Sequence, residues 1–201
     1  ESSIRIPLAI TGPGFRQGGQ IQELVSLIDI PPTLLDAAGL DVPAHMQGRS
    51  IMPLVRGDRS DWPSDVFVQI SESHVGRAIR TKRWKYAVHA PDKNGRRDPG
   101  SDIYEELFLY DLEADPYELT NLIHMQSHRA VADVLKQRLI KRMVEAGEAA
   151  PEIRPAESKP SGQRKVTEAE LVSELKKEID QIVDHYNRTG TIPGRKAHAA
   201  H

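Results

Sequence analysis

LFLYDLEADPYELTNL, residues 107–122, is the most informative stretch of this sequence. Its first half is rich in aromatic and aliphatic residues, which favours a β-strand over residues 107–112. Pro116 has no amide hydrogen to donate to a sheet and biases Asp115 away from helical geometry, so the strand must end before this dipeptide. The stretch is therefore predicted to be a strand, a tight turn and a short descent toward a helix.

The composition is that of a globular protein and excludes several classes of site. Of the 201 residues, 38% are apolar and 28% are charged. A formal net charge of -2 provides no overall field to attract nucleic acid or an anionic membrane, and no apolar run approaches the roughly 20 residues that span a bilayer. The absence of cysteine excludes disulfides, thiol nucleophiles and thiolate metal sites within these residues. The chain goes from Glu1 almost directly into a predicted strand, which suggests an excerpt of a longer polypeptide.

The N-terminal third is predicted to contain one strand and one helix. Residues 4–10 are a β-branched run closed by a Thr-Gly-Pro-Gly turn, which indicates a buried strand with Pro7 at an edge or bulge. Because this run is apolar on both faces, it needs cover on both sides, as at the edge of a larger, mostly parallel sheet. Asp29 is a candidate cap for a helix whose first turn holds Pro31 and Pro32, where an amide hydrogen would be unpaired anyway.

The middle of the chain is predicted to form a small antiparallel sheet packed by a helix. Three further strands are expected, at residues 65–70, 77–80 and 84–89. They would lie with the strand at 107–112, while residues 90–102 have the prolines, glycines and mixed charge of a solvated loop. Apolar residues recur at helical spacing from residue 127 to residue 147, so a helix is expected there, packed on the sheet.

A change of composition divides the C-terminal part into a linker, a helix and a tail. Prolines, glycine and serine among charges predict an extended linker at residues 150–166, and small polar residues predict a frayed tail at 189–201. Thr167 and Glu170 form a capping-box pattern, so a helix is expected over residues 167–187. Its apolar face consists of Leu171, Leu175, Ile179, Ile182 and Tyr186. That face must bury against the same chain, the missing part of the polypeptide or a second copy, so a homo-oligomer through this helix is one expectation.

Four motifs of this chain resemble, in the same order, those of the sulfatase family of sulfate-ester hydrolases, within the alkaline-phosphatase-like superfamily. The opening stretch carries the pattern "LYDLxxDPxExxNL" intact. Sulfatases also carry "IRVPLIIxxPG", "vslvDlxPTlldlaGi" and "GxSLxPLL", and the matching segments here are residues 4–14, 25–40 and 48–54. Any one motif alone would fit a turn or a cap in an unrelated α/β protein. All four in sequence indicate membership of the family.

The resemblance implies an α/β fold: the edge of a larger mixed sheet, followed by a small antiparallel sheet packed by a helix, plus a C-terminal helical extension. The expected parts are the end of a catalytic domain at residues 1–64, a sheet-and-helix subdomain at 65–149, a linker at 150–166, and a helix with a flexible tail at 167–201.

The resemblance also implies that the whole protein hydrolyses sulfate esters of a small molecule or a sugar. Sulfatases use a formylglycine made from Cys or Ser in a Cys/Ser-x-Pro-x-Arg motif, and a divalent cation such as calcium held by Asp and Asn oxygens. The family places these groups N-terminal to the segment that matches Ile4, so this chain is expected to hold no nucleophile, cofactor or metal ligand and to be inactive alone. Two alternatives stay open: a phosphoesterase or phosphonate hydrolase of the same superfamily, and a non-catalytic interaction or oligomerisation module.

Several residues that suggest catalysis have simpler interpretations. Residues 158–162 come nearest to the nucleophile motif, but Gly replaces the required Arg and the segment lies in the predicted linker. Asp111 and Asp115 suggest a metal pair, yet Asp is common in turns because its side chain bonds the local backbone. Asp29 and Asp36 are expected to be cap and surface residues. The histidines are scattered and show no zinc-binding helix pattern.

His74 and Arg77 are the predicted substrate-binding residues. They lie in and beside a loop between two predicted strands, and binding residues concentrate in loops on a rigid sheet. An imidazole and a guanidinium could contact a hydroxyl or an anionic group of a sulfated sugar through charge-assisted hydrogen bonds. The alternative is a solvated loop with ordinary polar residues.

The same region carries a basic cluster interleaved with aromatic residues. Its members are Arg77, Arg80, Lys82, Arg83 and Lys85, with Trp84 and Tyr86 between them. Such a pattern superficially resembles a nucleic-acid surface. In the sulfatase pattern the same spacing belongs to a hairpin in which alternate residues face solvent, so no nucleic-acid partner is expected.

Overall fold

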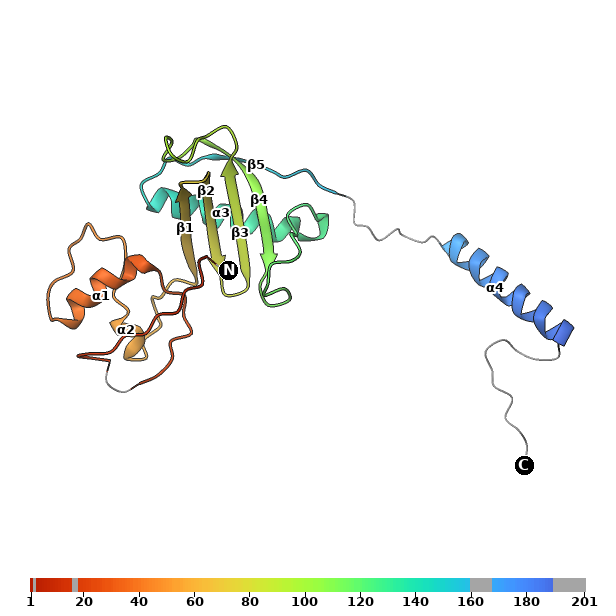
Figure 1. Ribbon diagram of the computed structural model, residues 1–201, viewed down its shortest axis with the longest axis horizontal. Coiled ribbons are helices and arrows are strands. Elements are labelled where there is room, and N and C mark those ends of the chain that lie inside the picture. Colours follow the sequence, from red (N-terminus) through yellow and green to blue (C-terminus); the bar gives the residue numbers. More distant parts are fainter. Residues whose placement is uncertain (2, 16–17, 160–167, 190–201) are drawn as a thin grey trace, which may run out of the picture. The chain divides into compact units, whose positions relative to one another are not determined.

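The computed structural model describes residues 1, 3–15, 18–159 and 168–189. The chain forms two compact units, Glu1–Pro160 and Ser161–His201 (Figure 1). In chain order the first unit contains η1 (Leu27–Asp29), α1 (Ile30–Ala37), α2 (Met52–Val55), β1 (Asp65–Ser71), β2 (Val75–Thr81), β3 (Trp84–Ala90), β4 (Ile103–Asp111), η2 (Gln126–His128), α3 (Arg129–Glu145) and β5 (Glu152–Arg154). The second unit contains α4 (Glu168–Thr189). These elements confirm the predicted mixture of helix and strand.

The centre of the first unit is a sheet with strand order β1-β2-β3-β4-β5 (Figure 1). The first four strands are antiparallel neighbours, and Ile79 pairs with Tyr86, which in turn pairs with Leu109. The predicted small antiparallel sheet is therefore confirmed, and β4 ends at Asp111 as the position of Pro116 requires. One β-bulge between Ala87 and Val88 shifts the pairing of β3 with β4.

Residues 107–122 are called the signature stretch below. The helix predicted to follow them is α3, which packs against the sheet (Figure 1). Leu139 and Met143 of α3 are fully buried against residues of β2, β3 and β4. The core comprises Val75, Ile79, Tyr86, Val88, Ala90, Tyr104, Leu109, Ile123, Ala132, Leu135, Leu139, Met143 and Ile153. Each large aliphatic side chain buried there contributes about 1.5–3 kcal/mol, so α3 is held mainly by packing rather than by intrinsic helix propensity.

Asp29 is buried and has a different capping role from the one that the sequence suggested. Its Oδ2 accepts a hydrogen bond from the Ser26 amide at 2.8 Å, and its Oδ1 accepts one from the Arg49 amide at 2.9 Å. Asp29 stands at the N-cap position of α1, as predicted, but its side chain makes no capping hydrogen bond to that helix, because a 3-10 turn begins earlier, at Leu27, and leads directly into α1. The carboxylate therefore ties the start of this helical segment to the segment that carries the "GxS" motif.

Two further contacts join α1 to the segment before α2. Asp36 is half-buried, and its Oδ2 accepts a hydrogen bond from Ser50 Oγ at 2.5 Å, so it is more than a surface residue. Thr33 Oγ accepts a hydrogen bond from the Ile51 amide at 3.0 Å. Gly48 lies so close to the preceding turn that a Cβ built on it would come within 1.9 Å of the Ile28 carbonyl oxygen. The sulfatase-like motifs at residues 25–40 and 48–54 are thus parts of one hydrogen-bonded unit.

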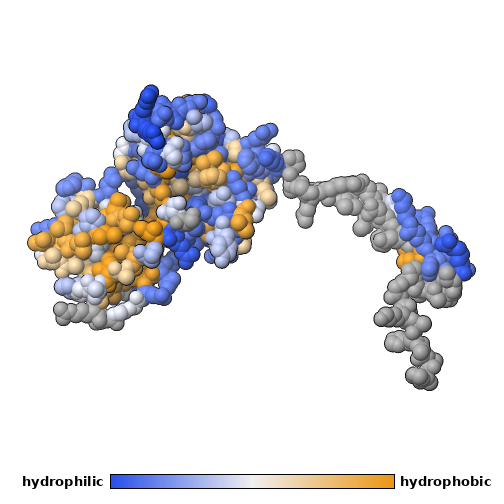
Figure 2. Space-filling model, in the orientation of Figure 1, coloured by the Kyte–Doolittle hydropathy of each residue, from blue (hydrophilic) through white to orange (hydrophobic). Residues whose placement is uncertain are grey.

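The predicted strand at residues 4–10 is not formed. This segment has no regular secondary structure, and Ile6 and Leu8 are 53% and 50% exposed. The physical reason is that no strand in the described part of the chain lies beside it, so its backbone has no sheet partner. Figure 2 shows hydrophobic residues gathered over this N-terminal region, around α1.

The residues just after α3 belong to the sheet, although composition predicted a linker from residue 150. The Glu152 amide donates to the Asp102 carbonyl oxygen at 2.8 Å, and β5 pairs in parallel with β4. Ile153 is buried in the core. Lys159 still bonds to the body, through a 2.9 Å hydrogen bond from its amide to the His124 carbonyl oxygen. Residues 160–166 of the predicted linker lie outside the described residues.

The second unit confirms the predicted C-terminal helix, since α4 spans Glu168–Thr189. The predicted cap Thr167, the tail beyond Thr189 and the side chains of Leu171, Leu175 and Tyr186 lie outside the described residues. Of the predicted apolar face, Ile179 and Ile182 are 57% and 43% exposed. Within the described ranges, no helix is both long and apolar enough to cross a membrane.

Candidate substrate-contacting site

The turn between β1 and β2 presents His74 to solvent. Ser73 and His74 are both exposed, and the Ser73 hydroxyl lies 3.1 Å from His74 Nδ1. The imidazole also lies over Gly76, where an added Cβ would approach His74 Nε2 to 3.0 Å. The glycine thus leaves room for the ring beside the strand. The His74 ring therefore has contacts within the chain but stays accessible, so it can donate a hydrogen bond to a ligand or accept one from it.

A polar hollow of about 570 Å³ lies beside this turn. It is lined by Glu72, Ser73, Pro91, Asp92, Lys93, Asn94, Gly95 and Arg96. The two loops that form it touch closely, because a Cβ on Gly95 would lie 2.6 Å from the Glu72 carbonyl oxygen. Both carboxylates and cations face the hollow, so it can bond hydroxyl groups as well as an anion. The sequence identified the 90–102 segment only as a solvated loop, since nothing local shows that it folds against the β1–β2 turn.

Arg77 is buried and uses most of its donors inside the chain. Its Nε donates to Glu148 Oε1 at 2.7 Å, and its Nη2 donates to the Pro99 carbonyl oxygen at 2.7 Å. Its Nη1 donates to the carbonyl oxygens of Ile70 and Gly76, at 3.3 and 2.8 Å. The guanidinium therefore ties β2 to the β3–β4 loop and to the residues after α3. It positions the loop that lines the hollow, and its own contact with substrate stays a prediction.

The turn that follows β4 within the signature stretch is called the signature turn. Two of its carboxylates form hydrogen bonds with other groups of the same chain. Asp111 forms a two-pronged ion pair with Arg83, with a shortest distance of 2.7 Å, and this pair holds the pKa of Asp111 below its usual range. Asp115 Oδ2 accepts a hydrogen bond from the Thr120 amide at 2.8 Å. Both carboxylates are therefore engaged by groups of the chain in and beside the turn. In the described part of the chain, no group of three or more His, Asp or Glu side chains is placed to hold a metal ion.

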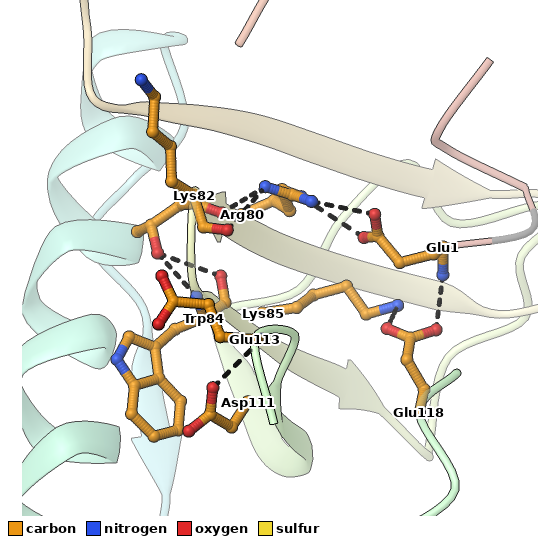
Figure 3. Close-up of polar contacts among 9 residues, drawn as sticks. Glu1, Arg80, Lys82, Trp84, Lys85, Asp111, Glu113 and Glu118 are labelled. Atoms are coloured by element: carbon orange, nitrogen blue, oxygen red, sulfur yellow. Dashed lines mark hydrogen bonds and ion pairs between the residues drawn. The ribbon is translucent and has the colours of Figure 1, made fainter. Parts of the chain in front are cut away.

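Asn121 and Glu118 fix the rest of the turn. Asn121 Oδ1 accepts hydrogen bonds from the Leu109 and Ile123 amides at 3.0 and 3.1 Å, and its Nδ2 donates to the Leu107 carbonyl oxygen at 2.9 Å. Glu118 has a φ of 57°, in the left-handed region. Figure 3 shows its carboxylate between Lys85 and the amino group of Glu1, with which it forms ion pairs.

Most cations of the basic cluster are paired within the chain. Arg80 binds the Glu1 carboxylate at 2.9 Å, Lys85 pairs with Glu118, and both side chains are only 14% exposed. The hairpin that the sequence predicted is formed by β2 and β3, with Thr81 Oγ accepting a 2.8 Å hydrogen bond from the Trp84 amide. Lys82 is the exposed cation at the hairpin tip and points away from the cluster in Figure 3.

This chain is similar in sequence to a protein family and to individual sulfatases. A family model described as "N-sulphoglucosamine sulphohydrolase, C-terminal" matches residues 1–145. Arylsulfatase K from Homo sapiens is 34% identical over 132 residues, which cover 61% of this chain and 23% of the relative. The extracellular sulfatase SULF-1 homolog from Drosophila melanogaster is 35% identical over 101 residues, which cover 43% of this chain and 9% of the relative. The chain therefore spans less than a quarter of the length of these relatives.

Two solved structures share the fold. BT4656 in complex with its substrate D-glucosamine-2-N,6-O-disulfate aligns with a TM-score of 0.51 and 24% identity, over 61% of this chain and 24% of that one. A protein studied in the metabolism of multiple glycosaminoglycans by Bacteroides thetaiotaomicron aligns with a TM-score of 0.50 and 23% identity, over 62% and 28%. Since the family model covers well over half of the 201 residues, the chain belongs to the sulfatase family, in the part described as the C-terminal region of N-sulphoglucosamine sulphohydrolase.

Proposed function

We propose that the protein to which this chain belongs hydrolyses sulfate esters, and that residues 1–159 supply its scaffold and one wall of its substrate pocket. The observation that carries the proposal is the family match over residues 1–145, within which all four sulfatase-like motifs lie. The hydrogen bonds of Asp29, Asp111 and Asn121 support a structural role for these motifs.

The substrate is a sulfated sugar or a similar small sulfate ester. Two observations support this class: BT4656 is bound to a sulfated glucosamine, and the hollow beside His74 offers both donors and acceptors. His74 would bond a hydroxyl or the sulfate of the substrate, because its imidazole is exposed and it follows Ser73, which lines the hollow. Arg77 would hold the 99–100 segment in place for this contact.

The calcium ion and formylglycine that the family implies do not fit the residues of this chain. The chain has no cysteine, the segment 158–162 lacks the arginine of the nucleophile motif, and the described residues offer no cluster of metal ligands. Both groups would have to be held by other parts of the whole protein. No step of the reaction is assigned to them in this chain.

Turnover of model substrates tests the proposed function, and the KM of a His74 variant tests the role of that residue. The whole protein should turn over an aryl sulfate faster than an aryl phosphonate, whereas the 201-residue chain alone should turn over neither. His74→Ala in the whole protein should raise the KM for a sulfated disaccharide about tenfold, the loss of one charge-assisted hydrogen bond, with little change for a small aryl sulfate.

His45→Ala, which removes another exposed histidine, is the matched control and should leave both KM values unchanged. A preference for the phosphonate would move the protein to the phosphonate-hydrolase alternative. Equal effects of His74→Ala on both sulfates, or on kcat alone, would contradict substrate contact by His74.

The alternative function, an oligomerisation module, is favoured by one observation. Along α4, the side chains of Ile179, Ile182 and Val183 are 57%, 43% and 49% exposed within the second unit. Replacing Ile179 and Ile182 by Lys should convert a self-associating chain to a monomer in sedimentation, because a buried charge would oppose the contact. The control Gln181→Lys adds the same charge to an exposed polar position of the same helix. A chain that is monomeric without any substitution would rule the module out.

A further inference from the structure

A second hollow, here called the tryptophan groove, lies on the first unit between the 59–64 segment, the β2–β3 turn and α3. Its volume is about 840 Å³, and its apolar lining is larger than that of the polar hollow. The apolar lining comes from Trp62, Trp84, Val131 and Val134. Val134 is 56% exposed, although it belongs to the helix that carries the core residues Leu135 and Leu139. A ligand could therefore bury apolar surface here.

Both tryptophan rings are held in place by contacts within the chain. Trp62 Nε1 donates a hydrogen bond to the Leu24 carbonyl oxygen at 2.8 Å. Trp84 meets the ring of His128 edge-on, with centroids 6.1 Å apart, and the Arg83 guanidinium lies 4.8 Å from its ring centroid. Rings that are already fixed lose little entropy on binding, and a flat indole suits the apolar C–H face of a pyranose.

The rim of the groove is basic, and two of its cations form no direct ion pair with the described residues. Arg59 is paired with Glu23 at 2.8 Å, and Arg83 is paired with Asp111 at 2.7 Å. Lys82 and Arg138 are both exposed and form no ion pair with any residue that the structure describes. Figure 3 shows the Lys82 side chain extending away from the other residues drawn. Lys82 also interacts electrostatically with the Glu23 carboxylate, so the groove offers an anion one cation without a carboxylate partner, Arg138, and one whose charge is partly balanced.

Glu23 supplies a third chemical feature. One of its oxygens, Oε1, accepts the hydrogen bond from Arg59, while Oε2 is buried and accepts none from the described residues. A buried acceptor without a donor is costly, so a ligand hydroxyl at this position would be favourable.

We propose that the tryptophan groove binds a sulfated oligosaccharide. A sugar ring would lie on Trp62 and Trp84, a hydroxyl would donate to Glu23 Oε2, and a sulfate would accept from Lys82 and Arg138. The combination of an aromatic floor, an unpaired acceptor and two cations without a direct ion pair matches the three kinds of surface that such a sugar carries. The proposal goes beyond ester hydrolysis, because binding here requires no turnover.

Tryptophan fluorescence of the 201-residue chain reports on this groove, because the chain has two tryptophans and both line it. Titration with a heparin tetrasaccharide should give a saturable change in emission. The affinity should fall as salt is added, since the contacts to sulfate are ionic and near the surface. The same tetrasaccharide after chemical desulfation should bind about tenfold more weakly or not at all.

The variant Lys82→Gln/Arg138→Gln removes these two cations and keeps both tryptophans. It should weaken tetrasaccharide binding about tenfold or more while leaving the melting temperature unchanged, because neither side chain forms a direct ion pair with the described residues. The matched control is Arg154→Gln, which removes an exposed cation from β5 at the opposite edge of the sheet from β1. That variant should bind like the unsubstituted chain.

Several results would overturn the proposal. No saturable change, or equal binding of the double variant and the control, would show that the groove does not take the sugar. Equal binding of the desulfated tetrasaccharide would remove the sulfate contact. Equal binding of hexaglutamate would make the rim a general anion surface, and equal binding of inorganic sulfate would indicate an adventitious ion only.

Discussion

Asn121 joins the two ends of the signature turn through three hydrogen bonds to the backbone. It bonds the amides of Leu109 and Ile123 and the carbonyl oxygen of Leu107, so one amide group joins the end of β4 to the chain after the turn. A backbone hydrogen bond from Leu122 to Leu109, at 2.8 Å, runs beside it. The asparagine of the motif is therefore explained by hydrogen bonding to the backbone, without any contact to substrate.

The corresponding prediction is that Asn121→Ala destabilises the chain by about 2–4 kcal/mol, because three backbone groups lose their partner at once. Urea unfolding followed by circular dichroism measures this change. Asn187→Ala, at an exposed position of α4, is the control and should change the unfolding free energy of the sheet unit by less than about 0.5 kcal/mol. Equal midpoints for the two variants would contradict the structural role of Asn121.

Glu106 is the buried carboxylate that connects three elements. From β4 it accepts hydrogen bonds from Arg129 of α3 at 2.5 and 2.7 Å, from Tyr86 of β3 at 3.0 Å and from the Ala156 amide after β5 at 2.9 Å. Burial by itself would raise the pKa of Glu106, but these hydrogen bonds, led by those from Arg129, hold it below the ordinary value of 4.5. Burial, together with Glu106, also raises the pKa of Tyr86, so this hydroxyl stays protonated and donates.

A carboxyl whose pKa is lower in the folded chain than in the unfolded chain stabilises the fold above its unfolded pKa. That contribution is lost as the pH falls through the lower, folded pKa. Glu106→Gln should cost about 3 kcal/mol at neutral pH, where a buried ion pair is broken. The difference in unfolding free energy between the two proteins should then shrink as the pH drops below about 4.5.

Chemical denaturation at a series of pH values measures this difference. Glu105→Gln is the matched control, since Glu105 is the neighbouring residue of the same strand and forms none of these bonds. It should give a difference near zero at every pH. A gap for Glu106→Gln that stayed constant across the acid range would show that Glu106 is not the titrating group.

The sequence predicts those helices and strands whose signal lies within a short stretch of the chain. Alternating apolar residues predict β1, β2 and β3, helical spacing predicts α3 and α4, and Pro116 predicts the end of β4. The strand β5 was missed because three residues carry no periodicity, and its place depends on the distant Asp102 carbonyl oxygen. The run at residues 4–10 wrongly predicts a strand, because an apolar run indicates burial without showing which strand lies beside it.

The residues of the candidate site also differ in whether local sequence could predict their positions. His74 could be predicted because a polar turn between two strands must lie at the surface. That Arg77 faces inward could not, since its partners Pro99 and Glu148 are far from it in sequence. Neither hollow could be predicted from the sequence, because the polar hollow joins two loops and the tryptophan groove joins four separate segments.

At the scale of the whole chain, the main unexplained surface is the apolar face of the N-terminal region (Figure 2). Its exposed members are Ile6, Leu8, Leu27, Ile28, Leu34, Leu40 and Val42. Leu27 and Leu34 are 63% and 58% exposed. Exposed apolar residues are more concentrated in this region than on an ordinary protein surface, so we predict that the region contacts other protein.

The 201-residue chain alone should therefore bind a hydrophobic dye such as ANS in its folded state, before any unfolding transition. Leu27→Lys/Leu34→Lys should lower the dye fluorescence severalfold, because both side chains lie on the exposed face and neither contributes to the core. Leu119→Lys is the matched control: Leu119 is 83% exposed and belongs to the signature turn, not to the N-terminal segment. Each variant must keep the circular dichroism spectrum of the unsubstituted chain. If the control lowers the fluorescence as much as the double variant, the dye is reporting general exposure, and the N-terminal face is not the surface that it binds.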